Sequence, residues 1–305
     1  MLYGFDMGGT KIEMAVFDSQ LKQLWQKRVA TPKNDYQALL HTFKQLTDEA
    51  DQRFSCKGKI GIGIPGLIDH QQGTIFTTNV PAAKYQPLCD DLQQLLQRPI
   101  KIDNDANCFA LSEAWHEDYR AYESVLGIIL GTGVGGGLVI EGRLFSGKNS
   151  AAGEIGHLGL PASALALLEG EIPLLPCGCG KKGCIENYLS GRGFEWLYHH
   201  FYQQSLSAPD IVERYYNNDT HAIEHVERYL SLLAHCLGDI LTLFDPHLVV
   251  LGGGLSQFDI LYSELPKRLP QHLFSVARVP PIKPAYYGDA GGVRGAAFLN
   301  LPAVR

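Results

Sequence analysis

Residues 2–17 read LYGFDMGGTKIEMAVF, in which two apolar segments flank a glycine pair. The first segment, Leu2 to Phe5, and the second, Ile12 to Phe17, have the length and β-branched or aromatic content of strands. The residues between them, Asp6 to Thr10, predict a tight turn. A third strand is expected at Leu24 to Val29. Three consecutive short strands at the start of a chain indicate a sheet that the following segments must cover.

The next hundred residues alternate between helical and strand patterns. Apolar side chains recur at helical spacing from Tyr36 to Leu46. The remaining predicted elements of this half are a strand at 60–64, a helix at 88–96, a strand at 100–102 and a helix at 106–116. Strands followed by alternating helix and strand predict a mixed α/β sheet.

The second half begins again with paired strands around a glycine turn, at 125–130 and 137–140. An irregular stretch from Gly153 to Cys184 follows, and then a helix from about Ala222 to Phe244. The last predicted elements are a buried strand at 248–251 and a helix at 290–299. Because both halves open with strand, glycine turn and strand, we expect two similar α/β domains facing each other.

The composition limits the class of protein. The chain has 305 residues, 45% of them hydrophobic, and a net charge of −6, which is typical of globular proteins and unfavourable for nucleic-acid binding. Asp6, Lys11 and Glu13 interrupt any signal-peptide core. The longest uncharged stretch, Val125 to Ile140, is too short and glycine-rich to cross a membrane. We therefore expect a cytoplasmic protein with no nucleic-acid or membrane partner.

The turn at Asp6-Met7-Gly8-Gly9-Thr10-Lys11 has the composition of a phosphate site. Its glycine N–H groups can face phosphate oxygens, and Thr10 and Lys11 add a hydroxyl and a cation. Asp6 supplies a carboxylate that could hold Mg²⁺ through water. A plain hairpin turn is the alternative, although the flanking residues favour phosphate.

Two further glycine turns follow later strands. Residues 131–137, GTGVGGG, formally contain the G-x-G-x-x-G pattern of dinucleotide-binding folds, but the next segment predicts a strand instead of the helix that this fold requires. Gly147-Lys148 nearly completes a phosphate-loop motif, yet Asn149 replaces its Ser or Thr, so we interpret it as an ordinary loop. Gly252-Gly253-Gly254 could pack against an adenine or ribose, or could be a crowded turn.

Three cysteines lie within one short loop. Cys177, Cys179 and Cys184 provide three thiolates, and His157 is a plausible fourth ligand. In a reducing compartment this set predicts a closed tetrahedral Zn²⁺ site, with free thiols as the alternative. The other four cysteines are scattered and are interpreted as small buried side chains.

The segment Asp103-Asn104-Asp105-Ala106-Asn107 lies between a predicted strand and a predicted helix. From the residues alone, Asp105 is expected to be the N-cap of the helix. The segment also stands at the carboxyl edge of the sheet, where α/β sheets bind ligands.

In combination and order, these motifs resemble those of the ROK family of sugar kinases. The matching segments are 6–11, 104–107, 131–137, 153–157 and 177–186, and matches extend over nearly the whole chain. The resemblance implies an actin-like (ribonuclease H-like) ATPase fold with two α/β domains around a cleft. It divides the chain into a small domain, 1–118 plus the final helix in 289–305, and a large domain with the zinc loop, 119–288. Segments 103–114 and 177–193 most resemble family members that act on N-acetyl-D-glucosamine.

The resemblance also implies a mechanism. ATP would bind with Mg²⁺ in the cleft, and Asp105, held by Asn104, would take the proton from the sugar 6-hydroxyl as it attacks the γ-phosphate. Glu154, His157 and Glu186 would bind sugar hydroxyls together with Asn104 and Asp105, and Asn79 is a candidate for reading the acetamido group. His157 would use one ring nitrogen for a structural Zn²⁺ and the other for sugar.

The residues that the resemblance assigns to ATP are Gly4, Phe5, Asp6, Met7, Gly8, Gly9, Thr10, Lys11, Thr132, Gly133, Val134, Gly135, Gly136, Gly137, Leu138, Val139, Ile140, Gly253 and Gly254. Glucose and N-acetylmannosamine kinases share all of these motifs and are alternatives. A sugar-sensing repressor is a remote alternative, because this sequence starts directly at the first strand. Relatives are often dimers, so a homodimer is a further expectation.

Overall fold

The computed structural model describes residues 1–77, 79–168, 172–288 and 291–302. The chain divides into two compact units. The first unit contains Met1–Glu123, Gly137–Gly153 and Tyr287–Arg305, and the second contains Ser124–Gly136 and Glu154–Tyr286. The domain limits expected from the sequence stay a prediction, and residues 289, 290 and 303–305 of that prediction lie outside the described residues.

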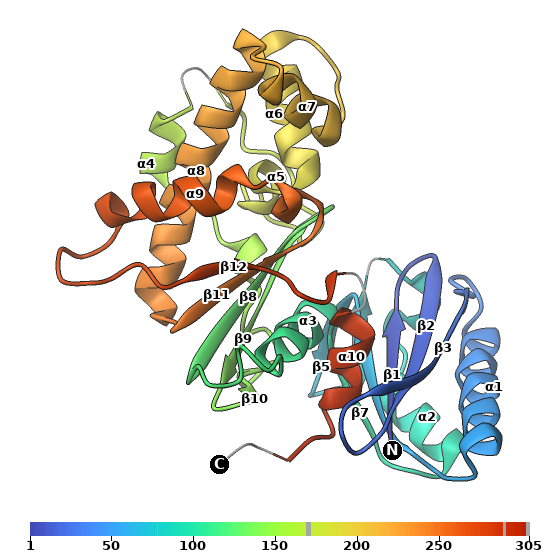
Figure 1. Ribbon diagram of the computed structural model, residues 1–305. Coiled ribbons are helices and arrows are strands. Elements are labelled where there is room, and N and C mark those ends of the chain that lie inside the picture. Colours follow the sequence, from blue (N-terminus) through green and yellow to red (C-terminus); the bar gives the residue numbers. More distant parts are fainter. Residues whose placement is uncertain (78, 169–171, 289–290, 303–305) are drawn as a thin grey trace. The chain divides into compact units, whose positions relative to one another are not determined.

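A five-stranded mixed sheet forms the centre of the first unit, in the order β3-β2-β1-β4-β7 (Figure 1). β1 pairs antiparallel with β2 and parallel with β4, and β4 pairs parallel with β7. The opening segment therefore folds as expected, as two strands joined by a tight turn. The strands of this sheet are β1 (Leu2–Met7), β2 (Lys11–Phe17), β3 (Gln23–Ala30), β4 (Lys59–Ile64) and β7 (Ile100–Asn104).

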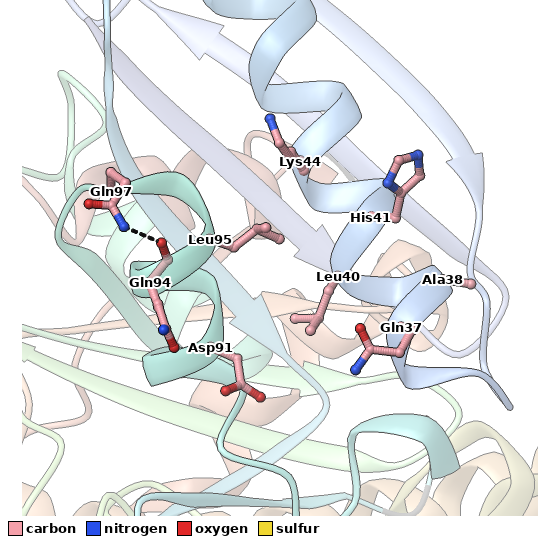
Figure 2. Close-up of a pocket in the computed structure, with 9 residues that line it drawn as sticks. All are labelled: Gln37, Ala38, Leu40, His41, Lys44, Asp91, Gln94, Leu95 and Gln97. Atoms are coloured by element: carbon pink, nitrogen blue, oxygen red, sulfur yellow. Dashed lines mark hydrogen bonds between the residues drawn. The ribbon is translucent and has the colours of Figure 1, made fainter.

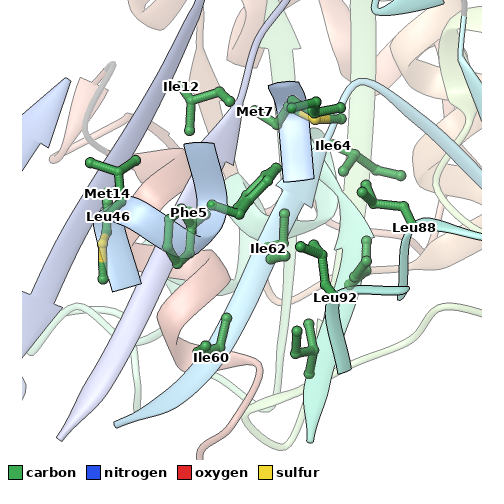
Figure 3. Close-up of a cluster of buried hydrophobic side chains, with 14 of the residues drawn as sticks. Phe5, Met7, Ile12, Met14, Leu46, Ile60, Ile62, Ile64, Leu88 and Leu92 are labelled. Atoms are coloured by element: carbon green, nitrogen blue, oxygen red, sulfur yellow. The ribbon is translucent and has the colours of Figure 1, made fainter. Parts of the chain in front are cut away.

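One face of this sheet carries the hydrophobic core of the first unit. Alternate residues of β1, such as Phe5 and Met7, point to the same side and are fully buried beneath α1 (Tyr36–Phe54) and α2 (Leu88–Leu96). Figure 3 shows Phe5 and Met7 among the isoleucines of β4 and the leucines of the two helices. The period of two along each strand and the helical spacing in α1 thus bury one continuous cluster.

The opposite face is covered by α3 (Asp105–Ala114) and α10 (Gly291–Phe298). Helix α10 packs so closely on β1 and α3 that their backbones are in contact. A Cβ on Gly4 of β1 would lie 2.0 Å from the carbonyl oxygen of Val293, and one on Gly295 of α10 would lie 1.7 Å from that of Cys108 in α3. Gly4 and Gly295 are therefore required where α10 meets β1 and α3, because no side chain fits at either place.

The second sheet has the order β10-β9-β8-β11-β12. β11 pairs parallel with β8 and with β12, and β9 pairs antiparallel with β10. The boundary between the two units falls within β9, after Gly136. The strands of this sheet are β8 (Ser124–Leu130), β9 (Val134–Ile140), β10 (Arg143–Leu144), β11 (Leu248–Gly252) and β12 (Ile282–Pro284).

Helices make up most of the rest of the second unit. The longest, α8 (Thr220–Phe244), buries one apolar face and lies where the spacing of its leucines predicts. The other helices of this unit are α4 (Ala162–Ala166), α5 (Glu186–Leu189), α6 (Gly191–Tyr202), α7 (Ala208–Tyr216) and α9 (Ile260–Arg268), with 3₁₀ segments at Ile155–His157, Gly254–Gln257 and Leu269–His272.

Two short elements of the first unit complete the fold. A hairpin of β5 (Gly66–Asp69) and β6 (Thr74–Thr77) follows β4, and a 3₁₀ turn covers Pro81–Ala83. Across the described part of the chain, each helix is too short or too polar to span a lipid bilayer.

Candidate active site and metal centre

The first glycine turn is a hairpin between β1 and β2. The N–H of Gly8 donates to the carbonyl oxygen of Lys11 over 2.9 Å, which closes the turn. Asn79 lies directly against it, because a Cβ on Gly9 would be 2.9 Å from the Asn79 carbonyl oxygen. The structure thus brings the first glycine turn, which is predicted to bind phosphate, next to Asn79, the candidate for reading the acetamido group. Both Thr10 and Asn79 are exposed and accessible to a ligand.

The N-cap of α3 is Asn104, so the expectation that Asp105 caps this helix was wrong. Asn104 has an extended backbone, with φ −64° and ψ 148°, and its side-chain oxygen accepts from the N–H groups of Ala106 at 2.8 Å and Asn107 at 3.3 Å. Both residues have side chains that cap well, and the backbone angle at the end of β7 selects the earlier one. Asp105 is therefore the first residue of the helix, where the helix dipole favours its ionised form.

Asp103 holds this segment in place, a role that the sequence did not reveal. Its carboxylate accepts from the Asn104 N–H at 2.8 Å, the Asn107 side-chain amide at 2.7 Å and the Ser146 hydroxyl at 3.0 Å. The Asn104 side chain donates in turn to the carbonyl oxygen of Gly66 at 3.1 Å. Ser146 is distant in sequence and has no motif of its own, so only the fold could identify its contact with Asp103.

Asp6 lies on the face of β1 that α10 covers, in an environment that disfavours its charge. Burial, followed by the negative charges of Asp105 and Glu13, raises the pKa of Asp6 to about 7, and Lys11 and Arg28 oppose this effect only in part. The negative charge of Asp105, which helps to raise the pKa of Asp6, makes this a favourable place for a divalent cation, because a cation would relieve the repulsion between the two carboxylates. This electrostatic coupling links Asp6 to Asp105 within the first unit.

We expect the Asp6→Asn variant to be more stable than the parent chain above pH 7 when no nucleotide is present. The folded-state pKa of Asp6 lies above its ordinary value of 3.8, so folding favours the protonated form. The contribution of protonated Asp6 to the free energy of unfolding is complete below about pH 4 and is lost as the pH rises towards 7. Asparagine resembles the neutral acid and does not titrate, so the variant keeps this contribution at high pH.

Denaturant unfolding of both proteins at intervals from pH 5 to 8 measures this difference. The free energy of unfolding of Asp6→Asn minus that of the parent should increase with pH over this window and then level off. A difference that stays constant would show that Asp6 titrates normally.

The second glycine turn joins β8 to β9. A strand follows it, as expected, so the dinucleotide-binding interpretation is excluded. The N–H of Gly131 donates to the carbonyl oxygen of Gly133 over 3.0 Å, and Thr132 at the tip is exposed. By contrast, Leu138 and Val139 are buried within β9, so only their backbone could serve a nucleotide.

The third glycine turn follows β11. Gly253 has φ +84°, and a Cβ there would lie 2.5 Å from the backbone carbon of Leu130, so this position is a crowded turn. At Gly254 a Cβ would meet nothing within 4 Å, which leaves its surface open for a ligand.

The four predicted metal ligands lie together in the second unit. One ligand atom from each of His157, Cys177, Cys179 and Cys184 lies within 4.8 Å of the others. Sγ of Cys179 is 3.6 Å from Sγ of Cys184, and Sγ of Cys177 is 3.5 Å from Nδ1 of His157. A tetrahedral zinc with Zn–S bonds of about 2.3 Å separates its sulfurs by roughly 3.8 Å. Three sulfurs and one imidazole at these distances fit a structural zinc ion.

Two carboxylates flank His157 on its two ring nitrogens. Oε1 of Glu186 lies 3.5 Å from Nδ1, and Oε2 of Glu154 lies 3.7 Å from Nε2. Burial raises the pKa of Glu154. Nδ1 is the ring nitrogen next to Cys177, and Nε2 faces Glu154. Because the two nitrogens point to different groups, His157 can bind a metal and a polar ligand at once.

A groove of about 900 Å³ lies elsewhere in the first unit, between α1 and α2 (Figure 2). Its charged side chains are already paired, since Asp91 accepts from the Tyr36 hydroxyl at 2.7 Å and Lys44 contacts Asp48 at 2.6 Å. The groove includes no residue that the sequence assigns to a site, and its lining residues are Gln37, Ala38, Leu40, His41, Lys44, Asp91, Gln94, Leu95 and Gln97.

The fold and these motifs define a class of protein. The model of the ROK family matches residues 2–302, and the chain belongs to this family. It is 60% identical over 301 residues to the N-acetyl-D-glucosamine kinase of Yersinia pseudotuberculosis serotype IB (strain PB1/+), covering 99% of both chains.

Solved structures support the same class. A ROK hexokinase from Thermus thermophilus is 30% identical, with a TM-score of 0.86, and the match covers 98% of this chain and 97% of that one. A ROK family glucokinase from Streptomyces griseus, solved with glucose and AMPPNP, is 26% identical, with a TM-score of 0.75 and 98% of each chain covered. The expected actin-like ATPase fold is confirmed.

Proposed function

We propose that this protein transfers the γ-phosphate of ATP to the 6-hydroxyl of N-acetyl-D-glucosamine, in the cytoplasm, and that it serves amino-sugar salvage. The assignment of N-acetyl-D-glucosamine as the substrate rests on the 60% identity, over nearly the full length of both chains, to a kinase named for that sugar. The family and the retained motifs support the phosphate transfer.

Asp105 is proposed as the general base. It stands at the first position of α3, where the helix dipole favours the carboxylate, and Asn104 caps the helix in its place. It would take the proton of the sugar hydroxyl as that oxygen attacks the γ-phosphate in line. Asp103 acts as a positioning residue, because its bonds to Asn104 and Asn107 fix the start of the helix.

The two glycine turns, at 6–11 and 131–137, are proposed to hold the phosphates, and Gly253 and Gly254 the nucleoside. When bound, Mg²⁺ would neutralise charge on the β- and γ-phosphates, and Asp6 is the residue proposed to orient it through water. The raised pKa of Asp6 fits this role, since a carboxylate repelled by its neighbours gains from a nearby cation.

Sugar binding is assigned to Asn79, Asn104, Asp105, Glu154, His157 and Glu186. Carboxylates accept hydrogen bonds from sugar hydroxyls, and side-chain amides both accept and donate them. Asn79 is proposed to read the acetamido group. A structural zinc held by His157 and the three cysteines would fix the ring of His157, and with it the direction of Nε2.

The test is ADP release with Mg·ATP across N-acetylglucosamine, glucose and N-acetylmannosamine. We expect kcat/KM for N-acetylglucosamine to exceed the others by about a hundredfold, or 2.7 kcal/mol. The Asn79→Ala variant should narrow this ratio while leaving turnover of glucose nearly unchanged. A preference for glucose would contradict N-acetylglucosamine as the substrate but would agree with phosphate transfer from ATP to a sugar.

A further inference from the structure

The second glycine turn is attached to the segment that follows the metal ligands. We define the phosphate turn as residues 131–134. The carbonyl oxygen of Gly131 accepts from the N–H of Gly191 at 2.7 Å. Gly191 begins α6, a few residues after Cys184 and directly after the short helix that carries Glu186.

Glu186 spans the distance between the phosphate turn and the cysteine loop. One carboxylate oxygen, Oε1, lies 2.9 Å from Sγ of Cys177. The other, Oε2, would lie 2.9 Å from a Cβ on Gly133. A single side chain thus packs against a metal ligand on one side and against the tip of the phosphate turn on the other.

The residue before His157 contacts the turn from a third direction. A Cβ on Gly156 would lie 2.0 Å from the carbonyl oxygen of Val134, so the two backbones are in direct contact. The phosphate turn is therefore held by neighbours of His157, Cys177 and Cys184. A turn that contains Gly131 and Gly133 has much conformational freedom of its own, and such contacts restrict it.

We propose that the metal centre sets the position of the phosphate turn, with Gly156 and Glu186 as positioning residues, so that nucleotide affinity depends on metal binding. This inference rests on the proposed function, because it takes the turn at 131–134 to bind ATP phosphates. The loop of the three cysteines has few apolar side chains and would lose its order without the metal. The contacts at Gly156, Glu186 and Gly191 would then no longer hold the turn.

The first experiment compares the metal-stripped protein with the same protein reloaded with Zn²⁺. AMPPNP with Mg²⁺ is titrated calorimetrically into each, with sugar absent, and circular dichroism checks that both are folded. We expect metal removal to raise the Kd for AMPPNP about tenfold or more. By linkage, AMPPNP should strengthen zinc binding by the same factor. Equal nucleotide affinity in the two forms would overturn the proposal.

Hydrogen exchange at residues 131–136 supplies a readout that needs no nucleotide. Exchange there should become faster on metal removal, while exchange in β1 and β4 stays the same. If the loaded protein binds no AMPPNP, the proposed function fails, and the exchange rates still decide the coupling. Unchanged exchange at residues 131–136 would overturn the proposed coupling between the metal centre and the phosphate turn.

Two glycine variants separate this coupling from a general loss of order. Gly156→Ala introduces the clash with Val134 and should raise the Kd for AMPPNP about tenfold with metal bound. Gly159→Ala is the matched control, because a Cβ there meets nothing within 4 Å. The control should bind metal and AMPPNP as the parent does. Parent-like AMPPNP binding by Gly156→Ala, with or without bound metal, would contradict the proposal.

Discussion

Replacing Asp105 with asparagine is expected to lower kcat/KM for sugar phosphorylation about a thousandfold. Asparagine is close to the same size but cannot accept the proton of the sugar hydroxyl. Asn104, and not residue 105, caps α3, so the helix start should survive the change. Steady-state ADP release at saturating Mg·ATP measures the effect, which we expect mainly in kcat.

The matched control is Asp118→Asn, because the Asp118 side chain is 77% exposed and its contact with His116 is long, at 3.8 Å. It should keep the parent activity. Calorimetric titration should show that Asp105→Asn still binds AMPPNP. Parent-like turnover by Asp105→Asn would remove this residue from the chemistry, and loss of AMPPNP binding would indicate a structural defect.

Replacing Gly295 with alanine is expected to destabilise the protein by about 3 kcal/mol or more, which ranks with severe core substitutions. The new Cβ would lie 1.7 Å from the Cys108 carbonyl oxygen and 2.9 Å from its Cα, so α10 and α3 must separate. Alanine favours a helix more than glycine does, so intrinsic propensity predicts the opposite sign. Thermal unfolding therefore distinguishes the two effects clearly.

Gly291→Ala provides a comparison within the same helix. Its Cβ would lie 3.3 Å from a ring carbon of Phe109, a side chain that can move slightly. We expect a much smaller change in Tm for this variant. If Gly295→Ala unfolds at the temperature of the parent, the close approach of α10 to α3 is not a determinant of stability.

Much of the first sheet could be predicted from the sequence, because β1, β2 and β4 are largely apolar and the turn between β1 and β2 contains a glycine pair. The helix at Tyr36–Phe54 and the long helix at Thr220–Phe244 follow from regular spacing of apolar residues. The β5–β6 hairpin could not be predicted. Its strands have four residues each and a mixed polarity that resembles a loop.

For the candidate site, the sequence predicted that His157 and the three cysteines would lie together, and it missed the contacts that support the segment from Asp103 to Asn107. The cysteine spacing is local, and it needed only one distant histidine to complete the set. The contact between Asp103 and Ser146 depends on the loop after β10, which reaches back to the end of β7. The choice between Asn104 and Asp105 as the cap depends on a backbone angle, which composition does not specify.

The place of α10 in the sequence has a consequence for biosynthesis. Gly4 of the first strand and Cys108 of α3 both meet a helix that begins only at Gly291. While the chain is being translated, the part of the first sheet that α10 covers stays exposed until residues 291–298 have left the ribosome. The nascent chain therefore displays that part of the face throughout the synthesis of the second unit, and this is the surface on which a chaperone would act.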